Sequence, residues 1–243
     1  MFLPLKDINP TYRKPVVTIS LIVINVLVYI YQMSLGPKVA ALVAAYGATP
    51  FEITRMTDLV GVTNLGFRLA HYPGPKPIFL TLVTSMFLHG GIMHLGGNML
   101  YLWIFGNNIE DILGPAKFLL FYFVCGLAAH AFHIASDPSS LIPTVGASGA
   151  ISGLLGAYLI AYPRAQVLTL VFLFIFIRLA VIPAFVIIIF WFFIQLVYGM
   201  ASLGGMQTGG VAWFAHIGGF IAGVILIYAL AGSTIYWLRH RGY

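Results

Sequence analysis

Charged residues are scarce in this 243-residue chain, at 7% of the sequence, and only six of them are acidic. Soluble proteins contain about 25% charged residues, whereas 60% of this chain is apolar. That composition excludes a soluble globular protein, and several membrane spans of ~20 residues would leave no room for a separate soluble domain. The sequence therefore predicts an all-α polytopic membrane protein with a single domain.

Other features that the sequence lacks exclude further classes of protein. A second cysteine is missing, so Cys125 cannot form an intrachain disulfide. The net charge is +6, but the basic residues are scattered singly and not gathered with aromatics into a patch, so we expect no nucleic-acid partner. The H-E-x-x-H motif is also missing, and no carboxylate lies near His94 or His216. We expect no metal and no cofactor.

Hydropathy and turn residues divide the chain into apolar runs that could cross a membrane. The predicted spans are 15–33, 91–109, 117–135, 146–162, 183–200 and 213–238. Residues 1–14 and 239–243 become tails on either side of a 15–238 domain. Within it, 34–90 is predicted as a long loop whose apolar part, 77–88, is too short to span and is re-entrant or interfacial. Residues 166–182 are predicted as a hairpin or an interfacial segment.

Basic residues indicate the orientation, because cytoplasmic loops carry an excess of Lys and Arg. With the N-terminus inside, eight of the twelve basic residues lie in cytoplasmic segments and four outside. Both termini are therefore predicted to be cytoplasmic.

Ionisable groups inside a membrane span are costly enough to be functional hypotheses, and the candidates are few. They are His94, Asn98, His130, His133, Ser148, Ser152 and His216, with His89 just before the second span. His94 and Asn98, Ser148 and His216 enter from the outside on the second, fourth and sixth spans, so all four are predicted at similar depth. If the fourth span is considered alone, a simpler alternative to catalysis is that glycines such as Gly149 and Gly153 pack this span against another helix.

A serine and a histidine at one depth can perform acyl transfer, with the imidazole accepting the serine proton during attack on a carbonyl. His94 and Asn98 are four residues apart, on one helix face, and could donate hydrogen bonds to the oxyanion. All six acids lie outside the predicted spans, so we expect a Ser148–His216 dyad without a third, acidic member.

These residues form motifs that resemble the rhomboid family of intramembrane serine proteases. The nucleophile motif is Gly146-Ala147-Ser148-Gly149, the H-x-x-x-N motif is His94-Leu95-Gly96-Gly97-Asn98, and the base motif is Ala215-His216-Ile217-Gly218-Gly219. His89 matches a recurrent family histidine, and Glu110 resembles a structural acid that follows the second span. The resemblance covers about residues 15–238 and implies a six-transmembrane-helix rhomboid-like bundle.

By this resemblance Ser148 is the nucleophile, His216 is the general base, and His94, Asn98 and the Ser148 backbone N–H form the oxyanion site. Two departures from the family pattern stand out. Leu80-Thr81 replaces a frequent Trp-Arg pair, and Ser152 replaces an aromatic ring that often lies against the catalytic histidine. The orientation of His216 is therefore expected to depend on another residue.

The expected function is a serine endopeptidase that hydrolyses peptide bonds in or next to transmembrane segments of other proteins in the lipid bilayer. The expected location is a bacterial inner (plasma) membrane, and the oligomeric state is left open. A non-catalytic rhomboid-like protein that binds membrane helices is the alternative. A transporter or channel, which would need charged or polar groups that continue across the membrane, is less favoured, since the inner halves of the second, fourth and sixth spans contain no charged residue. The loop 201–212 or the fifth span is a candidate gate for substrate entry.

Overall fold

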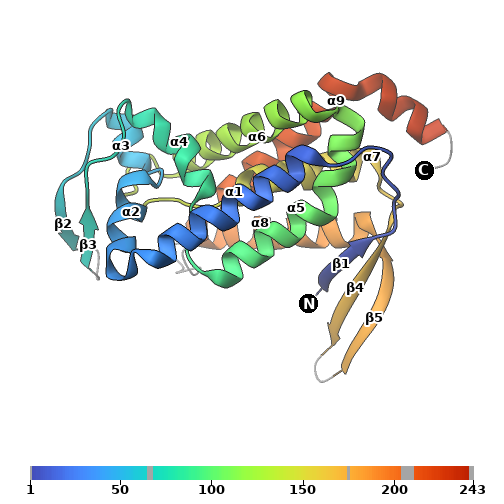
Figure 1. The fold of residues 1–243 in the computed structure, drawn as a ribbon, viewed down its shortest axis with the longest axis horizontal. Coiled ribbons are helices and arrows are strands. Elements are labelled where there is room, and N and C mark those ends of the chain that lie inside the picture. Colours follow the sequence, from blue (N-terminus) through green and yellow to red (C-terminus); the bar gives the residue numbers. More distant parts are fainter. Residues whose placement is uncertain (1, 65–67, 174–175, 204–210, 241–243) are drawn as a thin grey trace.

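The long helices of the structure, a computed structural model, coincide closely with the predicted apolar runs. The model describes residues 2–64, 68–173, 176–203 and 211–240. The long helices are α1 (Val16–Ser34), α5 (Ile92–Leu113), α6 (Pro115–Ser136), α7 (Ser148–Ala161), α8 (Ala184–Leu203) and α9 (Trp213–His240). Several of them run along the long axis of the molecule (Figure 1).

The expected number of six spans is not confirmed by length and hydropathy. Among the described residues, four helices qualify as spans on their own: α1, α6, α8 and the Trp213–Tyr236 part of α9. Helix α5 qualifies only together with the preceding segment Ile78–Phe87, from which it is bent by 82°. Helix α7 has only 14 residues, about 21 Å, against a hydrocarbon core of ~30 Å.

The predicted long loop contains short elements. They are η1 (Gly36–Lys38), α2 (Val39–Tyr46), α3 (Pro50–Arg55), β2 (Gly61–Asn64), β3 (Arg68–His71), η2 (Ile78–Leu80), α4 (Thr81–Thr84) and η3 (Ser85–Phe87). Strands β2 and β3 pair as an antiparallel hairpin. Ile78–Phe87 of the apolar piece is helical, and its sharp bend into α5 has the geometry of a re-entrant segment or a broken span.

Two small sheets correct the expectation of an all-α chain. Strands β4 (Gln166–Leu173) and β5 (Phe176–Pro183) form the hairpin at 166–182, and β1 (Phe2–Asp7), within the predicted N-terminal tail, adds to β4 in the order β1-β4-β5. Apolar runs of about eight residues suit a strand or a buried helix equally, so periodicity alone could not identify them. In Figure 1 this sheet projects from the helices at the opposite end from β2 and β3.

A buried carboxylate connects the sheet to the helices. Asp7, the last residue of β1, accepts hydrogen bonds from the Asn108 amide on α5 and from the Tyr158 hydroxyl on α7, the latter at 3.1 Å. Burial raises the pKa of Asp7 to about 6, although hydrogen bonds from Tyr158 and Asn108 oppose the shift. The position of β1 is thus defined by contacts with two separate helices.

Glu110 caps helix α1 from the end of α5. Its carboxylate accepts hydrogen bonds from the backbone N–H groups of Val17 and Thr18, at 2.9 and 2.8 Å, and from the Thr18 hydroxyl at 2.8 Å. The first N–H groups of a helix have no partner within the helix, and a negative charge there is favourable. The side chain is 1% exposed, so Glu110 has the structural position that its resemblance to the family acid implies.

Helix α7 is at the centre of the bundle, and small residues let α9 approach it closely. Every residue from Gly149 to Tyr158 is buried. A Cβ atom added to Gly219 of α9 would lie 2.0 Å from the Gly149 carbonyl oxygen, and one added to Gly223 would lie 2.0 Å from that of Gly153. No side chain fits at either position, and this close contact places the start of α9 beside the start of α7.

Candidate active site

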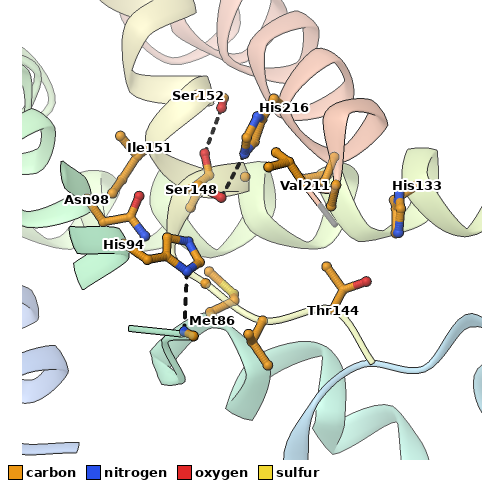
Figure 2. A pocket seen from close by; sticks show the side chains of 18 of the residues that line it. Met86, His94, Asn98, His133, Thr144, Ser148, Ile151, Ser152, Val211 and His216 are labelled. Carbon is orange, nitrogen blue, oxygen red and sulfur yellow. Dashed lines mark hydrogen bonds between the residues drawn. The ribbon is translucent and has the colours of Figure 1, made fainter. Parts of the chain in front are cut away.

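Ser148 and His216 are within hydrogen-bonding distance of each other. Ser148 is the first residue of α7, and His216 lies in the first turn of α9. The Ser148 Oγ and His216 Nε2 atoms are 2.8 Å apart (Figure 2), which is the separation expected for a serine and its general base. The two side chains come from segments 68 residues apart, and the contact between the glycines of α7 and α9 brings them together.

His94 lies against the loop that leads into Ser148. Gly146 has φ +124°, and a Cβ atom there would lie 2.8 Å from His94 Nε2, so both the backbone conformation and the space require glycine. The Gly90 N–H donates to His94 Nδ1 at 3.3 Å. Because Nδ1 accepts that bond, the proton of the neutral ring is on Nε2, and Nε2 is a donor on the side facing the loop.

Asn98 lies one turn after His94 on α5 and supplies a second possible donor. The side chain is 8% exposed, and its Nδ2 is among the buried atoms that have no hydrogen-bond partner within the described residues. In Figure 2, Asn98 and His94 lie on the other side of Ser148 from His216. The first N–H groups of α7 also lack partners within the helix. An oxygen carrying negative charge near Ser148 would be surrounded by unused donors.

Gln195 of α8 holds the other nitrogen of His216. Its Oε1 atom is 2.8 Å from His216 Nδ1, and its side chain is 3% exposed. The rings of Trp191 and Trp213 flank the imidazole, with centroids at 5.8 and 6.2 Å. Gln195 is absent from the candidates that the sequence suggests, although a lone amide in an apolar span is itself a signal.

Ser152 and His130 have other partners. The Ser152 hydroxyl donates to the Ser148 carbonyl on its own helix at 2.6 Å, which is the usual arrangement for a serine within a helix. His130 is buried and its Nε2 is 3.1 Å from the Ser85 hydroxyl, while the Ser85 carbonyl accepts the Gly146 N–H. His130 thus supports the loop before Ser148. His133 lies on the cavity wall, farther along α6.

These side chains line a cavity of about 900 Å³. Its wall includes His94, Asn98, Ser148, His216, Trp191 and Met86. The volume is in the range of small-molecule and cofactor sites and admits water. No group of three or more His, Cys, Asp or Glu side chains is arranged to hold a metal ion in the part of the chain that the structure describes. Most of the loop named as a candidate gate, 204–210, lies outside the described residues.

The fold and the site define a helical integral membrane protein with a serine–histidine pair on the wall of a cavity of about 900 Å³. A model of the Rhomboid domain matches residues 77–233, which include all four predicted site residues. The chain therefore belongs to the rhomboid family.

Individual relatives agree with this assignment. Rhomboid protease GluP of Bacillus subtilis is 38% identical over 150 residues, covering 61% of this chain and 25% of that protein. RHOMBOID-like protein 4 of Arabidopsis thaliana is 30% identical over 231 residues, covering 90% and 54%. Rhomboid protein 1, mitochondrial, of Saccharomyces cerevisiae is 29% identical over 155 residues, covering 60% and 40%. The chain thus spans between about a quarter and about half of the length of these relatives.

Proposed function

We propose that this protein is an intramembrane serine endopeptidase that uses Ser148 as nucleophile and His216 as general base. The observation that carries the proposal is the 2.8 Å contact between Ser148 Oγ and His216 Nε2, in a chain of the rhomboid family. The Bacillus subtilis relative is named as a rhomboid protease, which agrees with the proposal. No acidic side chain is needed, because the other histidine nitrogen is bonded to the neutral amide of Gln195.

The reaction follows from the positions of the donors and acceptors. Ser148 Oγ attacks the carbonyl carbon of a substrate peptide bond while its proton moves to His216 Nε2. The carbonyl oxygen becomes an oxyanion and accepts hydrogen bonds from His94, Asn98 and the Ser148 N–H. The C–N bond then breaks, and His216 protonates the leaving amine. Water, deprotonated by His216, attacks the acyl-enzyme and releases the second product and the free Ser148 hydroxyl.

The same proposal includes six spans, with residues 1–14 and 239–243 as cytoplasmic tails around the domain 15–238. The short helix α7 is compatible with this, because both of its ends can lie within protein. If its C-terminal end is at the inner surface, Ser148 lies about 9 Å below the outer edge of a ~30 Å hydrocarbon core. Water would reach it through the cavity, and the substrates would be transmembrane segments of other proteins, in a bacterial plasma membrane.

Cleavage of a model single-span substrate in liposomes tests the proposal. Wild type is expected to cut the substrate, whereas Ser148→Ala and His216→Ala are expected to lose cleavage while they keep the wild-type unfolding temperature. Equal cleavage by Ser148→Ala and wild type would refute the mechanism. If the wild type and both variants bind the substrate helix and none of them cuts it, the non-catalytic membrane-helix-binding alternative replaces the protease.

A further inference from the structure

The side chain of Gln195 does more than fill space in the helix bundle, because it makes specific hydrogen bonds. It is the one amide side chain of α8, in a helix that is otherwise almost entirely apolar. Both ends of the amide are bonded: Nε2 donates to the Trp191 carbonyl at 3.0 Å, and Oε1 lies 2.8 Å from His216 Nδ1. A buried amide with both ends satisfied is held in one orientation.

The orientation of this amide determines which nitrogen of His216 carries the proton. A backbone carbonyl can only accept a hydrogen bond, so the NH₂ end of Gln195 must face Trp191 and the oxygen must face His216. Because an amide oxygen can only accept, His216 Nδ1 must be the donor. In the neutral ring the proton is then on Nδ1, and Nε2 has the free lone pair that accepts the Ser148 hydroxyl.

We propose that Gln195 is a positioning residue that selects the Nδ1–H tautomer of His216 and so makes Nε2 available as the base. This inference rests on the proposed protease function. The amide replaces the carboxylate of an acid–histidine–serine triad and adds no charge to the membrane interior. His94 is held in the opposite tautomer by the Gly90 N–H, so the site has one histidine prepared to donate and one prepared to accept.

The test uses Gln195→Met, which keeps the length of the side chain and removes the acceptor, and Gln195→Glu, which keeps an acceptor. Ile188→Val is the matched control, because Ile188 lies seven residues earlier on the same face of α8 and is 1% exposed. This change loosens the packing of α8 without touching the bond to His216. Two measurements are made on each variant in detergent micelles: kcat and KM for the single-span substrate, and ¹⁵N spectra of the neutral histidines, with the His216 signals assigned by their loss in His216→Ala.

We expect the wild-type His216 signals to show the Nδ1–H form and Gln195→Met to lose that preference. We expect kcat of Gln195→Met to fall about tenfold to hundredfold, because a complete general base contributes about 10²–10⁴ in rate and this variant loses only part of that. KM should stay within about twofold of wild type. Gln195→Glu should recover most of kcat, and Ile188→Val should resemble wild type.

Several results would overturn the inference. They are a wild-type His216 in the Nε2–H form, a Gln195→Met variant that keeps either its tautomer or its kcat, failure of Gln195→Glu to recover activity, and an equal loss in Ile188→Val. The spectra decide about the tautomer even if the wild type cuts no substrate, so a failure of the protease proposal is seen separately.

Discussion

Replacing Gly219 by alanine should disconnect the serine from the histidine without touching either residue. The new Cβ would lie 2.0 Å from the Gly149 carbonyl oxygen, whereas a carbon and an oxygen in contact need about 3.3 Å. Helices α7 and α9 must therefore separate by about 1.3 Å, which lengthens the 2.8 Å Ser148–His216 contact to about 4 Å, beyond a hydrogen bond. We expect kcat to fall about 100-fold and stability to fall by about 1–3 kcal/mol.

The assay is cleavage of the single-span substrate together with thermal unfolding in the same detergent. Gly232→Ala is the matched control, since it is the same substitution on the same helix and its Cβ would meet nothing within 4 Å. It should cut and unfold like wild type. Cleavage at the wild-type rate by Gly219→Ala would contradict the predicted separation of α7 and α9. A loss of activity in Gly232→Ala as large as that in Gly219→Ala would contradict it as well.

Three further substitutions test other parts of the structure. Asn98→Ala should lower kcat by about 10²–10³ with little change in unfolding temperature, because the buried Nδ2 has no partner to lose among the described residues; wild-type kcat would exclude it from the oxyanion site. Glu110→Ala should lower the free energy of unfolding by about 2–3 kcal/mol, since it removes the cap of α1; a neutral effect in chemical denaturation would contradict that role. Asp7→Asn tests a pH dependence: burial raises the pKa of Asp7 from 3.8 to about 6, so the folded state binds the proton more tightly than the unfolded state. The tighter binding of this proton stabilises the wild type at low pH, and the stabilisation is lost as pH rises from about 4 to about 6. The difference in unfolding free energy between wild type and Asp7→Asn should therefore change over this interval and be flat above it. A difference that is flat from pH 4 to 8 would contradict the raised pKa of Asp7.

The helices were predictable because long apolar runs bounded by Gly, Pro and charged residues have few alternatives. The run 15–33 became α1, Val16–Ser34, and the run starting at 213 became α9. The strands were not predictable by the same means. The residues of β4 are apolar on both faces and carry no alternation, and β1 forms only because β4, about 160 residues later, offers it an edge. Pairing over such a separation leaves no local signal.

The residues of the site were predictable to the extent that the depth of each side chain in the membrane could be estimated from the predicted spans. Hydropathy and loop charge predict Ser148, His216, His94 and Asn98 in one layer, and in the structure all four line one cavity. Because Ser152 replaces the usual aromatic ring, the sequence also predicts that another residue orients His216. It does not indicate which residue that is. Gln195 reaches the histidine only through the rotation of α8 about its axis, and that rotation depends on packing with neighbouring helices.

The residue that reacts with a covalent serine-directed probe identifies the nucleophile, which is Ser148 in the proposed mechanism. Wild-type protein in detergent is treated with a fluorophosphonate, which reacts covalently with an activated serine, and the modified peptide is mapped by mass spectrometry. We expect label on Ser148, strong reduction of that label in His216→Ala, and no label in Ser148→Ala. Label on Ser152, or equal labelling of wild type and Ser148→Ala, would contradict that mechanism.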